Sequence, residues 1–491
     1  DGQKTLNPEL WRQAGETFRE EGPLPIREVN GVVEVAVGGT DDVVTLDELR
    51  RQTGWRVRPL LASREKMRAL RRRLMEQSFR EHRGDGNMET VSVEEADETT
   101  LEDLANQAPV IKLVNLIIMQ GISEGASDIH VEPFEKQTLV RYRIDGVLRT
   151  AMTQPAKIHA AVLSRIKIMA NLDIAERRIP QDGRISLKLM EKVYDLRVAT
   201  VPCLYGEGVV MRILDKGNIT LALDQLGFPD DLYAAFVQQI QRPHGIVLVT
   251  GPTGSGKTTT LYSALNHIKS DANKIITVED PVEYNLEGIN QIHVNAKVGL
   301  TFAAGLRSIL RLDPDVVMVG EIRDGETAEI AIKAALTGHL VFSTLHTNDS
   351  ISAVTRLGDM GVEPYLIAAA VNGILAQRLV RRTCEFCREE DTVDEQTRVL
   401  FESRGQKAPA RLPVAKGCDE CNGTGYSGRL AIYELFEIDE ELRGVISGGA
   451  STETLRTCAA ERGMSYLVDD GLRKVRAGLT TAAEVLRVAE S

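Results

Sequence analysis

This sequence is poor in cysteine and in aromatic residues, and it contains no long apolar run. Its 491 residues include six cysteines, and Trp, Tyr and Phe together make up 4%. Six cysteines are too few for a disulfide framework in a chain of this length, so the pattern favours a reducing compartment. No apolar stretch approaches the roughly 18 residues that cross a bilayer, so we expect no transmembrane segment.

An excess of basic charge is also missing. Lys and Arg number 59 against 71 Asp and Glu, which gives a net charge of −12. Nucleic-acid-binding proteins usually carry a basic footprint, so we expect no nucleic-acid partner. The N-terminus lacks the apolar core and cleavage site of a signal peptide, which predicts a cytoplasmic protein.

The chain divides into six predicted segments of different composition. Alternating stretches at 24–29 and 32–37, joined by Asn30-Gly31, predict a hairpin near the N-terminus. The predicted segments are a small N-terminal domain at 1–85 that ends in basic helical sequence at 63–83, an acidic linker at 86–105, a second N-terminal α/β domain with arginines at 106–220, an α/β core at 221–380, a cysteine module at 381–430 and a C-terminal helical region at 431–491.

Two patterns of secondary structure separate the second domain from the core. The second domain is predicted from a helix that starts near Pro109 and ends near Gly125, followed by alternating strands at 127–131, 138–144, 147–152, 184–189 and 193–200. The core instead has apolar strands separated by helices, at 245–250, 274–278, 316–319 and 340–344. Strands of that kind are typical of a mostly parallel sheet.

A phosphate-binding loop follows the first core strand. Residues 251–258 fit GxxxxGK[ST] between an apolar strand and a helical run, which is the context that confirms the motif. Its glycines let backbone N–H groups wrap phosphates, Lys257 bridges the β- and γ-phosphates, and the Thr258 hydroxyl ligates Mg²⁺. The expected ATP-binding residues are Gly251, Pro252, Thr253, Gly254, Ser255, Gly256, Lys257, Thr258 and Thr259.

Two further strand ends carry the carboxylates that hydrolysis needs. The strand 316–319 runs into Gly320-Glu321, so glycine takes the usual Asp place and Glu321 must supply the carboxylate. The strand 274–278 stops at Glu279-Asp280-Pro281. One carboxylate can position or deprotonate the attacking water while another serves the metal. The plain alternative for each strand end is a solvated turn.

Two histidines bracket the core strand 340–344. His339 precedes it and His346 follows it, and the polar pair Ser343-Thr344 near its end suggests a γ-phosphate sensor. We expect both histidines to be phosphate-sensing residues. The alternative is a structural role, which is more common for a lone histidine.

The second domain contributes a set of arginines. Arg184, Arg197 and Arg212 lie on its later strands. Arginines presented from outside a phosphate-loop domain are what a motor uses to sense and neutralise γ-phosphate charge. The alternative is a set of exposed arginines paired with neighbouring acids.

Four of the cysteines form two CxxC pairs. Cys384 and Cys387 are separated from Cys418 and Cys421 by 30 residues, which suits a closed tetrahedral zinc site. Four thiolates leave no open coordination position, so the Zn²⁺ is predicted to be structural. Redox pairs are the alternative. Cys203 and Cys458 are single, and we expect them to be ordinary buried thiols.

Together these motifs resemble a known family, the secretion ATPases of type II secretion and type IV pilus assembly. Residues 251–258, 279–281, 313–324 and 337–347 look like the family's Walker A, Asp box, atypical Walker B and His box. Residues 126–130 and 181–184 are similar to its second N-terminal domain. The likeness is close over 105–490 and looser over the first 85 residues.

The resemblance implies an α/β fold with a P-loop (RecA-like) ATPase core, a smaller sensor-like α/β domain, a further small N-terminal domain and a zinc-binding insertion. It implies Glu279 as general base and Glu321 as a magnesium-site carboxylate. It also implies a hexamer on the cytoplasmic face of the inner membrane that hydrolyses ATP and moves pilin-like subunits through a membrane partner.

Within that family, type II secretion is favoured over pilus extension. The spacing between the cysteine pairs is short, and the first domain looks like one that docks an inner-membrane L-type secretion protein and its platform complex. A nucleic-acid translocase and a scaffold that binds ATP without turnover are the more remote alternatives. The acidic charge opposes the translocase, and the presence of both Glu279 and Glu321 opposes the scaffold.

Overall fold

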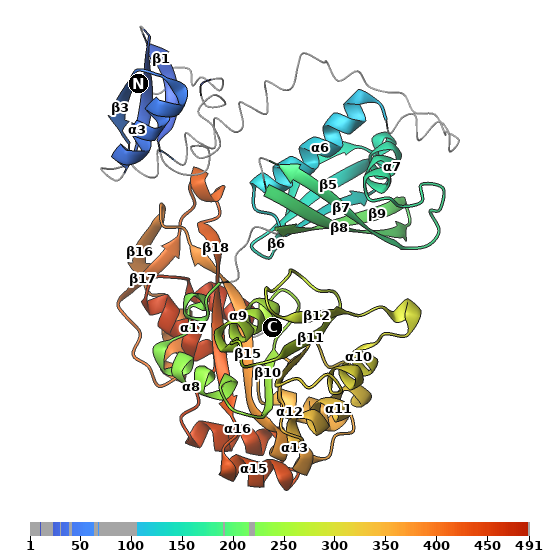
Figure 1. Ribbon diagram of the computed structural model, residues 1–491. Helices are drawn as coiled ribbons and strands as arrows, with labels where there is room; N and C mark the ends of the chain where they lie inside the picture. The colour runs from blue at the N-terminus through green and yellow to red at the C-terminus, as the bar shows by residue number, and fades with distance from the viewer. Residues whose placement is uncertain are drawn as a thin grey trace.

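The described part of the chain forms three larger sheets in succession and a separate two-stranded sheet, β16-β17 (Figure 1). A computed structural model describes residues 10, 23–29, 31–38, 42–62, 67, 106–189, 192–215 and 221–489. The expected basic helical stretch, apart from Met67, and the expected acidic linker lie outside these residues. Among the described helices, none has both the length and the apolar character needed to cross a bilayer.

The first sheet belongs to the small N-terminal domain. β1 (Leu24–Val29) and β2 (Val32–Val37) pair antiparallel, which confirms the predicted hairpin. β3 (Val57–Leu61) adds parallel to β2 after the helix α3 (Asp42–Thr53). Its core is a small apolar cluster made by Leu10, Val33, Val35, Val37, Leu46 and Leu49.

The second sheet is antiparallel, and two helices pack on it. α6 (Ala108–Ser123) buries Val114 and Ile117 against the sheet, as its helical spacing predicts, and it contacts α7 (His159–Met169). The strand order is β6-β5-β4-β9-β8-β7. The strands are β4 (Asp128–Pro133), β5 (Gln137–Ile144), β6 (Val147–Pro155), β7 (Gln181–Leu189), β8 (Lys192–Cys203) and β9 (Gly206–Asp215).

The third sheet forms the core and has the order β12-β11-β13-β14-β10-β15-β18. All neighbours pair parallel except β15 with β18, so the prediction of a mostly parallel sheet is confirmed. The strands are β10 (Gly245–Thr250), β11 (Ile275–Glu279), β12 (Asn290–His293), β13 (Val316–Val319), β14 (Leu340–Leu345), β15 (Val371–Thr383) and β18 (Tyr426–Glu437).

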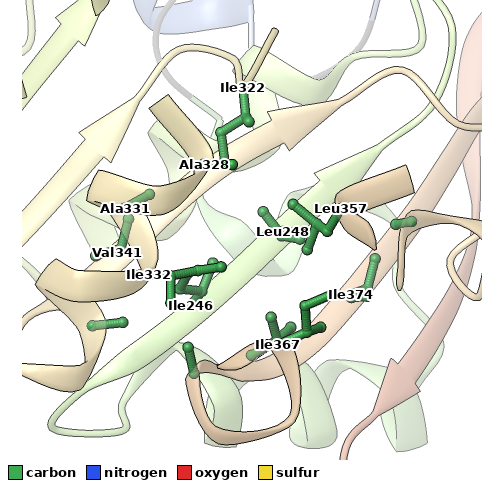
Figure 2. Close-up of a cluster of buried hydrophobic side chains, with 14 of the residues drawn as sticks. Ile246, Leu248, Ile322, Ala328, Ala331, Ile332, Val341, Leu357, Ile367 and Ile374 are labelled. Atoms are coloured by element: carbon green, nitrogen blue, oxygen red, sulfur yellow. The ribbon is translucent and has the colours of Figure 1, made fainter. Parts of the chain in front are cut away.

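Helices cover both faces of this core sheet. One face packs against α8 (Asp230–Ile240) and α9 (Lys257–Ile268). The other packs against α10 (Phe302–Ile309), α11 (Gly325–Leu336), α12 (Ser352–Asp359), α13 (Pro364–Ala370), α15 (Glu440–Ser447) and α16 (Thr452–Glu461). Figure 2 shows this second layer, where Ile246 and Leu248 of the sheet meet Ile332 and Leu357 of the helices. Each such buried side chain contributes roughly 1.5–3 kcal/mol.

The cysteine module and the C-terminal helices share one apolar cluster. α14 (Glu395–Ser403) and β17 (Arg411–Ala415) pack there against α17 (Leu467–Arg476) and α18 (Ala482–Ala489). β17 pairs antiparallel with the exposed strand β16 (Arg388–Thr392). β15 and β18 run through the expected boundaries at residues 380 and 430. The C-terminal region is therefore helical only after β18, because β18 continues to Glu437. The division of the chain into six segments stays a prediction, with the two boundaries next to the cysteine module falling inside β15 and β18.

Candidate nucleotide and zinc sites

The phosphate-binding loop joins β10 to α9 and lies against the backbone of β15. Gly251, Gly254 and Gly256 all have positive φ. A Cβ at Gly251 would lie 2.4 Å from the carbonyl oxygen of Gln377, so only glycine fits there. The first N–H groups of α9 face the loop, as anion binding requires. The exposed loop residues are Pro252, Thr253, Gly254 and Thr258.

Lys257 folds back over this loop. Its Nζ donates hydrogen bonds to the carbonyl oxygens of Gly251, at 2.7 Å, and Pro252, at 3.1 Å. Burial lowers the pKa of Lys257 to about 8, although the charge of Glu321 opposes the shift and that of Arg378 adds to it. Both of these hydrogen-bond acceptors are neutral carbonyls. A bound polyphosphate would supply a negatively charged partner and so favour the charged form of Lys257.

Glu279 ends β11 and is 3% exposed. Its Oε1 accepts hydrogen bonds from the Thr277 hydroxyl at 2.5 Å and the Gln291 amide at 3.1 Å, and its Oε2 accepts one from the Tyr262 hydroxyl. Tyr262 belongs to α9, so the carboxylate is tied to the helix that begins at the phosphate loop. Burial, followed by the charge of Glu279, raises the pKa of Tyr262. The tyrosine therefore remains a hydrogen-bond donor.

Glu321 follows β13 at the same edge of the sheet. It accepts a hydrogen bond from Arg323, and its Oε2 lies 3.2 Å from Nε2 of His346. Arg323 also lies 3.7 Å from the carboxylate of Asp280. Since the carboxyl ends of parallel strands meet at one edge, the two predicted acidic strand ends are joined there through Arg323.

The residues present at this edge fit a magnesium ion. Mg²⁺ prefers hard oxygen ligands, usually one or two from the protein together with phosphate oxygens. The Thr258 hydroxyl is exposed in the first turn of α9, and the Glu321 carboxylate is close enough to influence Lys257 next to it. These two groups supply the oxygen ligands that Mg²⁺ prefers.

His339 lies outside this site. It precedes β14, and its Nδ1 lies 2.9 Å from the carbonyl oxygen of Ala334 in α11. It is therefore about 20 Å along the strand from His346. The Ser343-Thr344 sensor stays a prediction. Both hydroxyls donate to backbone carbonyls of the neighbouring strand β13 and its end, at 2.8 Å each.

The three predicted arginines lie in one cross-strand row of the second domain. Arg184 on β7 pairs in register with Arg197 on β8, which pairs with Arg212 on β9. Arg197 reaches the core domain, where it donates to the Val282 carbonyl at 3.2 Å and lies 3.4 Å from the Glu283 carboxylate. Like charges directly opposite one another are destabilising, so the row favours a bound anion.

Arg212 forms an ion pair with an acidic residue of its own sheet. Its Nε lies 2.9 Å from Asp128 on β4, whereas Arg184 is exposed on β7, the edge strand of the sheet. Pairing with a neighbouring acid, the alternative interpretation, therefore describes Arg212 within its own sheet and Arg197 across to the core domain.

The four CxxC cysteines meet in one cluster. All four sulfurs lie within 4.8 Å of one another, and three of the pairs are 3.8 Å apart. Four sulfurs at about 2.3 Å from a tetrahedral zinc ion are about 3.8 Å apart, so the cluster fits Zn²⁺. The Gly425 N–H also donates to the Cys421 sulfur at 3.0 Å.

The two remaining cysteines differ from expectation. Cys203 is exposed and Cys458 is half-buried, so neither is an ordinary buried thiol. Cys203 ends β8 next to a two-residue turn, where no core forms around it.

Three site residues were missed at the level of sequence. Tyr262 and Gln291 hold Glu279, and Arg323 bridges Asp280 and Glu321. Arg323 is two residues from Glu321 in the sequence, so their proximity could have been predicted. Tyr262 and Gln291 carried no signal, because they come from α9 and β12 and meet only in three dimensions.

Comparison with known proteins accounts for nearly the whole chain. Residues 103–487 match the family described as Type II/IV secretion system protein, and residues 7–81 match the MshEN domain. The type II secretion system protein HxcR of Pseudomonas aeruginosa is 53% identical over 79% of both chains. The type II secretion system ATPase E of Vibrio cholerae is 52% identical over 78% of this chain and 76% of its own.

Two further likenesses come from pilus motors. The type IV pilus assembly ATPase PilB of Myxococcus xanthus is 48% identical over 94% of this chain and 83% of its own. The crystal structure of the pilus retraction motor PilT with bound ADP has a TM-score of 0.53 at 26% identity, over 77% of this chain and 96% of that one. The chain belongs to the Type II/IV secretion system protein family and, within it, to the type II secretion ATPases.

Proposed function

We propose that the chain hydrolyses Mg-ATP at the carboxyl edge of its core sheet to drive pseudopilus assembly and protein export. The observation that carries this proposal is the position of Lys257, Glu279 and Glu321 at one edge of that sheet. They follow β10, β11 and β13, with β14 lying between β13 and β10. A phosphate-binding loop with two carboxylates beside it is what attack of water on a γ-phosphate requires.

Each residue has a separate proposed role. Lys257 and the loop N–H groups bind the phosphates, with Gly251 to Thr259 forming the cradle. Glu279 orients the attacking water and accepts its proton, since its carboxylate is already fixed by neutral donors. Glu321 and Thr258 hold Mg²⁺, which when bound neutralises phosphate charge. His346 orients Glu321.

The arginine row is proposed to sense the γ-phosphate. Arg197 already bridges the second domain to the segment after Glu279, and Arg184 and Arg212 lie next to it in register. Because the row is carried on a separate domain, it can sense a γ-phosphate only where that domain faces a nucleotide, either in the same subunit or in a neighbouring one. This arrangement supports a homo-oligomer, and we propose a hexamer.

We also propose structural Zn²⁺ in the four-cysteine cluster and a location on the cytoplasmic face of the inner membrane. The sulfur spacing supports the metal. The relatives named for type II secretion support an inner-membrane L-type protein and its platform as partners of the N-terminal domain.

The proposal is tested by ATP binding and turnover in three variants. Lys257→Ala should lose both. Glu279→Gln should bind Mg-ATP as the wild type does but hydrolyse it at least about 100-fold more slowly, the usual size of a general-base contribution. Glu321→Gln should instead require more Mg²⁺ for activity. If Glu279→Gln shows the Mg²⁺ defect and Glu321→Gln the pure chemical defect, the two roles are exchanged.

A type IV pilus assembly ATPase is the second candidate. One observation favours it: the match to the Myxococcus protein covers 94% of this chain, whereas the two type II secretion matches cover 79% and 78%. Deleting the gene and scoring secreted protein and surface pili separately would distinguish the two functions.

A further inference from the structure

Two polar residues of β15 lie directly behind the phosphate loop. β15 pairs with β10 up to Ala376, which is opposite Thr250. The next two residues of β15, Gln377 and Arg378, therefore lie level with the start of the loop at Gly251. They are 2% and 3% exposed, although they are an amide and a guanidinium in the middle of a sheet.

Gln377 is fully used in holding the loop. Its amide nitrogen donates to the carbonyl oxygen of Ser255 at 2.7 Å, and its carbonyl oxygen accepts from the Thr260 hydroxyl at 2.7 Å. It thus joins the loop to the first turn of α9. Arg378 is different, because only part of its hydrogen-bonding capacity is used.

Arg378 lies between the phosphate loop and the segment that follows β14. Its Nη2 donates to the carbonyl and side-chain oxygens of Asn348, at 2.9 and 3.2 Å. Its Nε and Nη1 are buried and have no hydrogen-bond partner. Nη1 lies 3.2 Å from the point that a Cβ on Gly251 would occupy. One of the two unused donor atoms, Nη1, therefore lies next to the loop.

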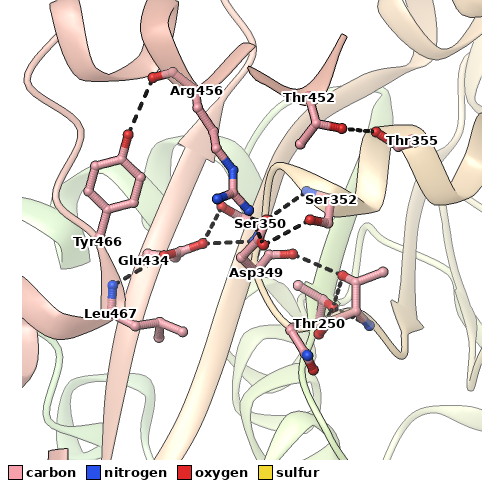
Figure 3. Close-up of polar contacts among 12 residues, drawn as sticks. Thr250, Asp349, Ser350, Ser352, Thr355, Glu434, Thr452, Arg456, Tyr466 and Leu467 are labelled. Carbon is pink, nitrogen blue, oxygen red and sulfur yellow. Dashed lines mark hydrogen bonds and ion pairs between the residues drawn. The ribbon is translucent and has the colours of Figure 1, made fainter. Parts of the chain in front are cut away.

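No carboxylate forms an ion pair with Arg378 in the described part of the chain. The acids that influence it are Glu434 and Asp349. Figure 3 shows that both are occupied elsewhere. Glu434 accepts from the Ser350 N–H and hydroxyl and from the Leu467 N–H, and Asp349 accepts from Ser352 and Arg456.

An arginine cannot lose its charge in a protein, and a buried charge without a direct partner is costly. The electrostatic influence of Arg378 reaches Lys257, since it contributes to the lowered pKa of that lysine. Two positive charges therefore influence each other at the phosphate loop, a buried one on Arg378 and a half-buried one on Lys257, while the charge of Glu321 acts in the opposite direction on Lys257. A polyphosphate held in the loop is the anion that would balance both.

We propose that Arg378 is a positioning residue of the nucleotide site, which ties the phosphate loop to the Asn348 segment and adds a second buried positive charge behind the nucleotide phosphates. The Asn348 segment also carries His346, so the same guanidinium links phosphate binding to the orientation of Glu321. This proposal rests on the nucleotide site described above. It assigns no direct contact with the nucleotide to Arg378.

The test separates charge from geometry with two substitutions in the full chain. In Arg378→Gln, the affinity for Mg-ATP and for Mg-ADP should fall about 10-fold, the effect of one charge several ångströms away in a medium of intermediate dielectric. In Arg378→Lys, the charge is kept and the planar fork to Asn348 is lost. The dissociation constants should stay within about 3-fold of wild type while kcat falls about 10-fold.

Arg443→Gln is the matched control. Arg443 is a half-buried arginine of the same domain, and it bonds to Ala368 and Asn372 at the opposite end of β15. This control should keep the wild-type nucleotide affinity. Zinc content and the midpoint of thermal unfolding, measured for every variant, show whether each one is folded.

Three results would overturn the proposal. They are wild-type affinity in a folded Arg378→Gln, an equal loss of affinity in Arg378→Lys and Arg378→Gln, and a similar loss in Arg443→Gln. If Arg378→Gln does not fold, the test rests on Arg378→Lys. A wild-type kcat in that variant would show that Arg378 has no positioning role. Hydrolysis by the wild type is measured in the same experiment, so failure of this proposal is distinguishable from failure of the ATPase assignment.

Discussion

At the scale of the residue, the carboxylate of Glu279 is fixed before any ligand arrives. Three neutral groups donate to it, from Thr277 on its own strand, Tyr262 on α9 and Gln291 on β12. Neutral donors orient a carboxylate without neutralising it, unlike a lysine or arginine. A carboxylate has about four acceptor positions, so capacity for a water molecule remains. Glu321, by contrast, is paired with Arg323.

Tyr262→Phe is expected to lower kcat about 10-fold while leaving the affinity for Mg-ATP unchanged. The substitution removes the donor to Oε2 of Glu279, so the carboxylate loses orientation, while no group on the phosphate loop is altered. Steady-state kinetics and nucleotide titration measure the two quantities. Tyr433→Phe is the control, because that buried hydroxyl donates to the Leu226 carbonyl, at 3.0 Å, and interacts with Thr260 rather than with Glu279. A normal kcat in Tyr262→Phe would show that Glu279 needs no such support.

Residues adjacent in sequence to a motif were predictable, and those brought from other elements were not. Lys257, Glu279 and Glu321 are marked by a loop pattern and by strand ends, and the structure places them at one edge. Gln291 and Arg378 lie in ordinary strand sequence. Their position depends on sheet order, with β12 next to β11 and β15 next to β10, which local periodicity does not encode.

At the scale of the element, the parallel strands were predictable because each is a short apolar run between turn residues. β15 and β18 were not recognised. β15 changes character along its length, from a mainly apolar half at 371–376 to a mainly polar half at 377–383. β18 has six consecutive buried residues at 431–436, a length that does not distinguish a strand from a buried helix. Their pairing is between segments about 50 residues apart, so it is visible only in the folded chain.

The four-cysteine element is expected to lose its metal when any one ligand is changed. Cys418→Ser replaces a thiolate by a hydroxyl that does not ionise near neutral pH, so bound zinc should fall from one equivalent to near zero and the β16–β17 hairpin should become sensitive to protease. Nucleotide binding should persist, because the phosphate loop has a separate core. Elemental analysis measures the zinc.

Cys203→Ser and Cys458→Ser are the matched controls for this prediction. Both remove a thiol outside the cluster, so both should keep one zinc per chain. Absence of zinc from the purified wild type, or a Cys418→Ser variant with normal metal content, would exclude a structural zinc site and leave the redox alternative.

The attachment of α18 to β15 is expected to depend on pH in the acidic range. Burial alone would raise the pKa of Glu484, but hydrogen bonds from Arg381 and Arg487 outweigh it and lower the pKa from 4.5 to about 2. A group with a depressed folded pKa stabilises the fold above its unfolded pKa. That contribution, about 3 kcal/mol, should be complete above pH 5 and lost as pH falls from 4.5 towards 2.

Glu484→Gln isolates this contribution. The variant should unfold at a lower temperature than the wild type at pH 7, and the difference should shrink as pH falls towards 3 because the wild type loses the same interaction. Thermal unfolding followed by circular dichroism at several pH values measures the difference. A gap that is the same at pH 7 and pH 3 would contradict the assignment.

At the scale of the whole molecule, the chain separates the phosphate loop and its carboxylates from a set of arginines carried on another domain. The loop and the carboxylates belong to the core sheet, and the row of Arg184, Arg197 and Arg212 is made by the second sheet. Of the three, Arg197 is joined to its own core domain by described contacts. Such a division suits a motor whose subunits complete one another's sites, because assembly then controls turnover.

The most direct test of this account is ATP turnover per protomer, measured against protein concentration across the range in which the oligomer forms. The account predicts that specific activity rises with concentration to a plateau, in step with the assembled fraction measured by sedimentation, and that Glu279→Gln assembles equally but stays inactive throughout. A specific activity that is independent of concentration while the assembled fraction changes would contradict a motor whose sites are completed by assembly.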